Sequence, residues 1–214
     1  MTTLYLIRHG TPDSNLAGVF QGKLDTSLNE RGMEQARLLA QRFAGVHLDR
    51  VYVSALQRAR QTAQLLCGQT GAPCTILPAL NEIDLGQLEG QSKSGWGQFP
   101  EAIRQFEKDV AHFQAPGGES TRQVYERMER AIDQIVGENP GGTVAVVSHG
   151  FTIQTYLNKA QGRPYEQMER CIVGNTAVSK FEYEGAGLPR VVYINDQSHL
   201  PEPLRFDLAE DQPG

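Results

Sequence analysis

The dipeptide His-Gly occurs twice in this chain of 214 residues, each time at the end of an apolar run. The first run is LYLIRHG, which ends in His9 and Gly10, and the second is VAVVSHG, which ends in His149 and Gly150. Apolar runs of this length are typical of buried strands in a parallel sheet. Ligands bind beyond the carboxyl ends of such strands, and glycine allows a ligand to come close to the backbone. The pattern therefore predicts an α/β fold in which two imidazoles meet at a ligand site.

The rest of the chain alternates between strand and helix patterns. The predicted strands span about 3–8, 50–54, 74–78, 143–148, 177–184 and 190–196. The predicted helices begin near residues 30, 55, 119 and 151, and Ser54 and Gln57 form a capping-box pattern that starts the second of them at Ala55. This order predicts one three-layer α/β/α domain over residues 1–205 with a mostly parallel six-stranded sheet. Within it, we expect residues 91–118 to form a small helical cap insert, and 206–214 to be a frayed tail.

Composition and charge narrow the class of protein. The net charge is −5 and there is no basic tract, so we expect no nucleic-acid partner. No apolar stretch approaches the length of a membrane span, and the N-terminus lacks the basic region of a secretory signal. Cys67, Cys74 and Cys171 form neither a CxxC motif nor a Cys/His cluster, which argues against a zinc site or a disulfide framework. We expect a cytoplasmic protein without a membrane partner. The sequence leaves its oligomeric state open.

Two arginines are candidates for the same site as the imidazoles. Arg8 precedes His9 at the rim of a buried strand, where an arginine needs an anionic partner. Arg58 and Arg60 fall at the start of the helix after the second strand, and residues two apart lie on opposite sides of a helix, so only one can face the pocket. We choose Arg58, because Thr62 shares its helical face. The alternative is that both are solvated helix charges.

Glu82 is the candidate general acid. It follows the third predicted strand in the segment LNEIDLGQLEG and is flanked by Leu80 and Ile83. A partly apolar setting raises the pKa of a carboxyl group, so that it holds a proton near neutrality. Asp84 and Glu89 in the same segment are competing candidates, and the residues alone leave this choice open.

The candidate residues together favour an anionic substrate. Phosphate is the best match, because a guanidinium group can bind it through two hydrogen bonds at once. The predicted helix after Gly150 adds backbone N–H groups at its N-terminus. The chain contains neither a Walker A motif nor a dense acidic cluster for Mg²⁺, which disfavours nucleotide-driven kinase chemistry.

Four blocks of sequence resemble the histidine phosphatase superfamily, also called the phosphoglycerate mutase-like fold. They are LIRHG followed by Asn15, then SALQRARQT, LNEIDLGQLEG and VSHG, and the resemblance covers roughly residues 3–200. It implies that His9 is the nucleophile, which forms a phosphohistidine through Nε2, and that Glu82 is the proton donor and later the base. We expect a hydrogen bond from Nδ1 of His9 to a backbone carbonyl to keep this imidazole neutral and oriented.

The resemblance also implies the residues that bind substrate. Arg8, Arg58 and His149 would bind the phosphoryl group, while Asn15, Gln21 and Gly22 would line the entrance. We expect neither a metal nor a cofactor, because the basic side chains supply the charge that phosphoryl transfer requires.

The same pocket serves phosphatases and mutases, so their difference lies elsewhere. Mutases of this family carry a longer insertion after the glutamate block and an ordered C-terminal tail. Here only about 35 residues separate Glu82 from the segment that starts at Gly118. We therefore predict hydrolysis of a small phosphomonoester, with inorganic phosphate as a product. The alternatives are a phosphoglycerate mutase and a catalytically silent phosphate-binding regulator.

The aromatic residues of the insert allow two interpretations. Trp96, Phe99, Phe106 and Phe113 either contact the organic part of a substrate or pack the cap onto the domain. Of the remaining histidines, we expect His47 and His112 to lie on the surface and His199 to have a structural role.

Overall fold

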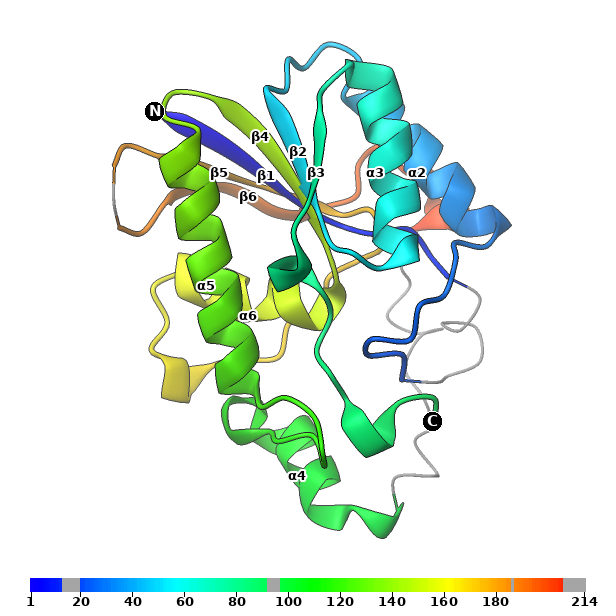
Figure 1. Cartoon of the computed structure of the whole chain (residues 1–214), viewed down its shortest axis with the longest axis vertical. Coiled ribbons are helices and arrows are strands. Elements are labelled where there is room, and N and C mark those ends of the chain that lie inside the picture. The colour runs from blue at the N-terminus through cyan, green and yellow to red at the C-terminus, as the bar shows by residue number, and fades with distance from the viewer. Residues whose placement is uncertain (13–19, 92–96, 186, 206–214) are drawn as a thin grey trace.

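The computed structural model describes residues 1–12, 20–91, 97–185 and 187–205. Six strands form one sheet in the order β3-β2-β4-β1-β5-β6. Their bounds are Thr2–Arg8 (β1), Arg50–Val53 (β2), Cys74–Ile76 (β3), Thr143–Ser148 (β4), Val178–Tyr183 (β5) and Arg190–Asp196 (β6). Strands β1 to β4 pair in parallel, whereas β5 runs antiparallel to both β1 and β6. The predicted six-stranded, mostly parallel sheet is therefore confirmed (Figure 1).

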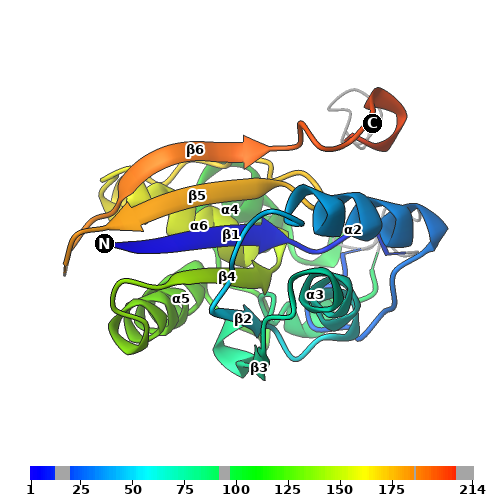
Figure 2. The ribbon, with the colours of Figure 1, turned by 90° about the horizontal axis from the view of Figure 1, so that it is seen from above.

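Helices cover both faces of this sheet. One face carries α2 (Glu30–Arg42) and α3 (Gln57–Thr70), and the other carries α5 (Thr121–Glu138) and α6 (Gly150–Ala160). Figure 2 shows these two layers on either side of the strands. The three-layer α/β/α architecture expected from the strand and helix order is confirmed.

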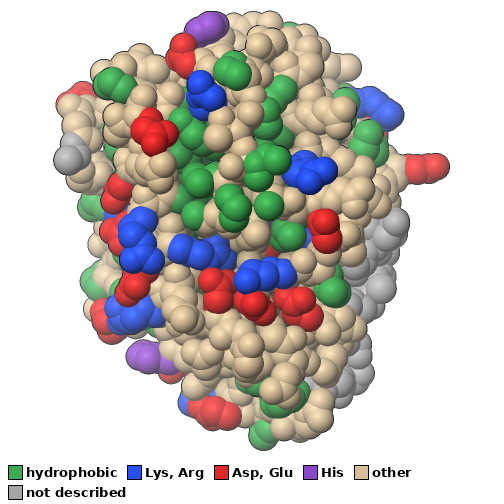
Figure 3. All heavy atoms as spheres, in the orientation of Figure 1, with side chains coloured by type: hydrophobic (Ala, Val, Ile, Leu, Met, Phe, Trp, Pro, Cys, Tyr) green, Lys and Arg blue, Asp and Glu red, His purple; other side chains and the backbone are tan. Residues whose placement is uncertain are grey.

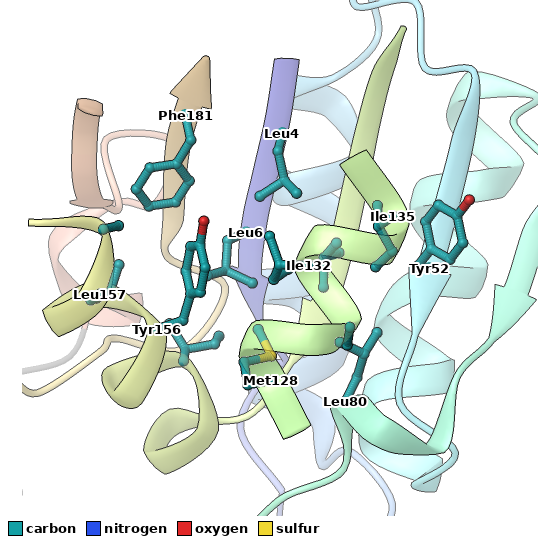
Figure 4. Close-up of a cluster of buried hydrophobic side chains, with 14 of the residues drawn as sticks. Leu4, Leu6, Tyr52, Leu80, Met128, Ile132, Ile135, Tyr156, Leu157 and Phe181 are labelled. Atoms are coloured by element: carbon teal, nitrogen blue, oxygen red, sulfur yellow. The ribbon is translucent and has the colours of Figure 1, made fainter. Parts of the chain in front are cut away.

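The central strand β4 is continuously apolar because helices cover it on both faces. Val144 and Val146 pack under α5 and α6, whereas Ala145 and Val147 pack under α2 and α3. A strand covered on both faces has no solvent side, so it lacks the polar alternation of a half-exposed strand. Figure 4 shows the first of these cores, in which α5 and α6 contribute side chains such as Met128, Ile132 and Tyr156.

The register between β1 and β4 places the two His-Gly dipeptides side by side. Ile7 pairs with Val147, and Arg8 pairs with Ser148 at the carboxyl ends of both strands. The backbone N–H of His9 then donates to the carbonyl of Ser148 at 3.1 Å. The two imidazoles therefore leave the sheet at the same edge.

The described part of the predicted insert contains a short helix, α4 (Pro100–Lys108), and a 3₁₀ turn over Val110–His112. It packs through Ala102 and Phe113 against Ile83, Leu85 and Leu88. Figure 1 places it beyond the N-terminal end of α5. Phe113 is fully buried in this small core, as expected if it holds the insert in place.

Several predicted element boundaries differ from the structure by one or two residues, and two of the differences have a clear local cause. Helix α3 begins at Gln57 rather than Ala55, and the predicted capping box does not form. The N–H of Gln57 donates to Oδ1 of Asp25, and the hydroxyl of Ser54 is engaged by Asn81 and His149. Strand β3 ends at Ile76 rather than residue 78, because Pro78 starts a 3₁₀ turn. Proline has no N–H with which to continue the ladder.

The surface carries charges of both signs. Figure 3 shows basic and acidic side chains next to one another over the face that carries α5. One such pair joins Lys159 to Glu129 at 2.5 Å between α6 and α5. The side chains of His47 and His112 are 84% and 60% exposed, which confirms their predicted surface position. No helix in the described ranges combines the length and the hydropathy needed to cross a membrane.

Candidate active site

One cavity lies where β1 and β4 end, and it contains most of the candidate residues. The polar part of its wall consists of Arg8, His9, Gln21, Gly22, Arg58 and Glu82. The apolar part consists of Phe20, Ile83, Leu85, Phe106 and Phe151. His149 is not part of this wall but lies against the ring of His9. Asn15, which the sequence places at the entrance, lies outside the described residues.

Hydrogen bonds orient the imidazole of His9. Its Nδ1 lies 2.6 Å from the carbonyl oxygen of Gly10, which can only accept, so Nδ1 carries the hydrogen. This is the hydrogen bond that the sequence analysis expects. Nε2 is left with its lone pair and accepts from Nε of Arg58 at 3.3 Å. Burial, followed by the charges of Arg58 and Arg8, holds the pKa of His9 well below 6.5. The ring is therefore neutral near pH 7.

The glycine after His9 allows a close approach of backbone from α2. A Cβ on Gly10 would lie 2.5 Å from the carbonyl oxygen of Gly32, at the start of α2. The N–H of Gly10 also donates to the hydroxyl of Thr62 at 3.1 Å. These contacts fix the turn that carries His9 and give the glycine a packing role that the sequence does not reveal.

Arg58 reaches the cavity from the first turn of α3. It is 1% exposed, whereas Arg60 is exposed, as the helical spacing predicts. Its Nη1 donates to the carbonyl of Leu24 at 2.6 Å and its Nη2 to that of Gly22 at 2.8 Å. Burial lowers the pKa of the guanidinium, an effect that the charge of Glu82 opposes. Arginine remains charged under these conditions because its ordinary pKa is so high.

Arg8 and His149 lie on either side of the β1–β4 junction. Arg8 donates from Nη1 to the carbonyl of Val173 at 2.5 Å. A Cβ on Gly150 would lie 3.3 Å from Nε of Arg8, so the glycine leaves room for this guanidinium. The ring of His149 is fully buried, and its centroid lies 4.9 Å from that of His9. Burial and the neighbouring His9 hold the pKa of His149 well below 6.5.

Glu82 is held by the N-terminus of α6. Its Oε2 accepts from the N–H of Phe151 at 3.1 Å, and its Oε1 accepts from the N–H and the hydroxyl of Thr152, both at 3.0 Å. The partly apolar setting therefore also contains backbone donors that the sequence does not reveal, because the first turn of a helix has N–H groups that require acceptors. The acceptor at this helix end is therefore the carboxyl group of Glu82.

The competing carboxylates have other partners. Asp84 forms an ion pair with Lys23 at 3.0 Å and accepts from the N–H of Gly86 at 2.9 Å. Glu89 accepts from the N–H of Lys23 at 2.7 Å. Both therefore fasten the loop at residue 23 to the segment that follows Glu82, and neither is part of the cavity wall.

Sequence reasoning missed several residues that support the site. Ser54, interpreted as a helix cap, lies 2.7 Å from Nε2 of His149. Arg127 of α5 donates to the carbonyls of Ala79 and Glu82 at 2.8 and 3.1 Å and pairs with Glu119. Nothing in the pattern distinguishes Arg127 from the solvated charges of the same amphipathic helix.

The aromatic residues of the insert divide between the two interpretations. Phe106 belongs to the cavity wall, where it meets Phe20 edge to face at a centroid distance of 5.4 Å. The guanidinium of Arg170 lies 4.6 Å from the centre of the Phe106 ring. Phe99 packs against the core that contains Phe113. Trp96 lies outside the described residues.

His199 is not part of the cavity wall and contacts residues of the surrounding fold. Its Nε2 lies 3.2 Å from the hydroxyl of Thr176, and its Nδ1 lies 3.3 Å from Nη1 of Arg42. Burial and the charge of Arg42 lower its pKa to about 4. Among the described residues, no group of three or more His, Cys, Asp and Glu side chains has the arrangement of a metal site.

The fold and this cluster define an α/β protein in which two buried imidazoles and two arginines gather beyond adjacent parallel strands. The chain belongs to the histidine phosphatase superfamily (branch 1), whose family model matches residues 4–197. The resemblance of the four sequence blocks is thereby confirmed.

Some relatives of this chain are named as phosphoglycerate mutases and others as phosphatases. A probable phosphoglycerate mutase GpmB of Serratia proteamaculans is 30% identical over 213 residues, covering 97% of this chain and 99% of the relative. The structure of Bacillus stearothermophilus YhfR has a TM-score of 0.87 and 33% identity, covering 93% of this chain and 99% of its own. A phosphoserine phosphatase variant of Entamoeba histolytica in complex with phosphoserine has a TM-score of 0.82 and 27% identity, covering 94% of this chain and 100% of its own.

Proposed function

We propose that this protein is a phosphomonoester hydrolase that acts through a phosphohistidine at Nε2 of His9. The observation that carries the proposal is the pairing of a neutral, buried imidazole with Arg58, whose Nε lies 3.3 Å from that nitrogen. A neutral imidazole is a nucleophile, and the adjacent guanidinium attracts a phosphoryl group to it. The complex of the Entamoeba histolytica relative with phosphoserine supports a phosphorylated small molecule as substrate.

The reaction has two steps. In the first, the lone pair of Nε2 forms a bond to phosphorus, the ester P–O bond breaks, and the leaving oxygen takes a proton from Glu82. In the second, water attacks phosphorus, Glu82 accepts its proton, and the P–N bond breaks with its electrons returning to Nε2. Arg8, Arg58 and His149 stabilise the charge on the phosphoryl oxygens, so the proposed mechanism is independent of metal.

Hydrolysis rather than mutase activity is favoured by the apolar part of the cavity wall. Beyond the two arginines, the described wall carries no further cation and instead presents Phe20, Phe106 and Phe151. A mutase substrate has a second anionic group, which needs a cationic partner when it is desolvated. We therefore propose that the preferred substrates are monoesters of uncharged, at least partly apolar alcohols.

The alternative activity is that of a phosphoglycerate mutase, which the name of the Serratia proteamaculans relative favours. The two activities differ in what happens to the phosphoenzyme. A phosphatase transfers the phosphoryl group to water, whereas a mutase returns it to substrate and excludes water.

The test compares p-nitrophenyl phosphate with 3-phosphoglycerate as substrates, with EDTA present throughout. We expect hydrolysis of the aryl ester, no interconversion of phosphoglycerates that exceeds hydrolysis, and loss of activity in His9→Ala. His112→Ala is the matched control, because this histidine is exposed and is not part of the cavity wall. Equal rates for His9→Ala and the wild type would contradict the assignment of His9 as the nucleophile. Rapid interconversion of 2- and 3-phosphoglycerate would favour the mutase.

A further inference from the structure

Ser54 has one hydroxyl hydrogen, and its partners decide where that hydrogen points. Oδ1 of Asn81 accepts from the backbone N–H of Ala55 at 2.9 Å, so this atom is the amide oxygen and has no hydrogen to donate. Oγ of Ser54 lies 2.9 Å from the same oxygen and must therefore donate to it. The N–H of Leu56 donates to Oγ at 3.1 Å. Toward any further partner, the hydroxyl of Ser54 is an acceptor.

His149 is that further partner. Its Nε2 lies 2.7 Å from Oγ of Ser54, and because the hydroxyl hydrogen is committed to Asn81, Nε2 carries the hydrogen of this contact. A neutral imidazole has only one N–H, so Nδ1 of His149 holds a lone pair. This Nδ1 is buried and has no hydrogen-bond partner among the described residues. Buried polar atoms are nearly always hydrogen-bonded, so an unpaired nitrogen in this place points to a bound ion or a role in the reaction.

The groups that face His149 are basic. They are His9, which follows β1, together with Arg8 of β1, Arg58 of α3 and Arg127 of α5. Together with burial they hold the pKa of His149 well below its ordinary value in the free protein. A phosphoryl dianion among the same groups would reverse this electrostatic effect, because an opposite charge favours the protonated imidazole.

We propose that Ser54 and Asn81 are positioning residues that hold His149 in its Nε2–H form, so that a phosphoryl group binds beside it together with one proton. An unprotonated phosphoryl oxygen can make no hydrogen bond with the lone pair of Nδ1. The proton either resides on Nδ1, which then donates to the phosphoryl oxygen, or resides on that oxygen, which then donates to Nδ1. Both arrangements contain the same number of protons, and neither forms or breaks a bond to phosphorus.

The first test needs no ligand and is independent of the proposed function. Nitrogen-15 NMR of the imidazoles distinguishes the two neutral forms, and a His149→Phe variant assigns the signals. We expect the wild-type ring of His149 to carry its hydrogen on Nε2. In Asn81→Ala the hydroxyl of Ser54 becomes free to donate to Nε2, so the hydrogen should move to Nδ1. A wild-type ring protonated on Nδ1, or no change in Asn81→Ala, would overturn the assignment.

The second test measures proton uptake when inorganic phosphate binds. Calorimetry at about pH 8, in buffers with different heats of ionisation, should give about one proton per bound phosphate for the wild type, because the ligand is then mainly a dianion. Asn81→Ala and Ser54→Ala should take up less than half as much, since Nδ1 can then donate without a further proton.

The outcomes separate the two proposals. If phosphate does not bind, the proposed function fails along with this inference. If phosphate binds without proton uptake, or with equal uptake in all three proteins, only the inference about Ser54 and Asn81 fails. A merely structural role of Ser54 would lower the midpoint of unfolding in Ser54→Ala without changing the number of protons.

Discussion

The imidazole rings of His9 and His149 lie with their centroids 4.9 Å apart and are inclined to each other by 57°. In each ring a neighbour fixes which nitrogen carries the hydrogen: Nδ1 of His9 donates to the carbonyl of Gly10, and Nε2 of His149 donates to the hydroxyl of Ser54. The two rings therefore retain lone pairs on opposite nitrogens. One ring is thus prepared to attack phosphorus through Nε2, while the other is prepared to share a proton through Nδ1.

Replacement of Arg58 should reduce activity strongly. In Arg58→Ala the cavity loses one of its two guanidinium groups, and the carbonyls of Gly22 and Leu24 lose a donor. We expect kcat/KM for p-nitrophenyl phosphate to fall by about 10²–10³, as for loss of a group that stabilises a charged transition state. Arg60→Ala is the matched control on the opposite side of α3 and should leave kcat/KM unchanged. A similar loss in both variants would mean that the helix, rather than the guanidinium, is affected.

Glu82→Gln should impair proton transfer to the leaving group. We expect kcat to fall by about 10²–10⁴ for an alkyl phosphate, and by less for p-nitrophenyl phosphate, whose leaving group needs no proton. Asp84→Asn and Glu89→Gln are the controls, because both carboxylates fasten a loop and lie outside the cavity wall. If either control reproduces the dependence on leaving group, that residue and not Glu82 is the acid.

Phe106→Ala tests the apolar part of the cavity. Loss of this ring should raise KM for p-nitrophenyl phosphate by about tenfold, in line with the burial of part of an aromatic side chain. KM for glycerol phosphate, which has no ring to contact, should change little. Phe99→Ala is the comparison, because Phe99 packs the insert without being part of the cavity wall. Equal effects on both substrates would indicate a general disturbance of the insert.

Stability should fall as the solution is made acidic. The pKa values of His9 and His149 lie well below 6.5 in the folded protein, and that of His199 is lowered to about 4. In the unfolded chain these rings bind protons at about pH 6.5, so below that pH the unfolded state binds more protons than the folded state. The free energy of unfolding therefore decreases as pH falls from about 6.5 toward 4, and this contribution is fully present above 6.5.

Urea denaturation at several pH values measures this effect. His199→Gln should show a shallower loss of stability between about pH 6.5 and 4, because one of the three groups no longer titrates. The same comparison with the exposed His47→Gln should leave the slope unchanged. A wild-type protein equally stable at pH 5 and 7 would contradict the buried, neutral state of these rings.

Much of the fold follows from two local sequence patterns, the apolar runs of buried strands and the spacing of residues along a helix. The two apolar runs that end in His-Gly predict adjacent parallel strands, and the register of Arg8 with Ser148 agrees with that prediction. Helical spacing separates Arg58 from Arg60, since burial on one side of a helix depends only on the angle between residues.

The unpredicted part of the site consists of contacts between distant segments. Ser54 fits a capping-box pattern, yet its hydroxyl bonds His149 and Asn81, which the topology brings to the same place. Glu82 has apolar neighbours in sequence, but the N-terminus of α6 meets it in space. Arg127 looks like a surface charge because its partners lie in a loop far along the chain.

The most direct measurement of the central claim is the trapping of a phosphoenzyme. The protein is mixed rapidly with p-nitrophenyl phosphate, quenched in alkali, which preserves a phosphorus–nitrogen bond, and digested for mass spectrometry. The account predicts one added phosphoryl group on the peptide that contains His9, absent from His9→Ala and retained in His112→Ala. Phosphoryl transfer to another residue, or full hydrolytic activity in His9→Ala, would contradict it.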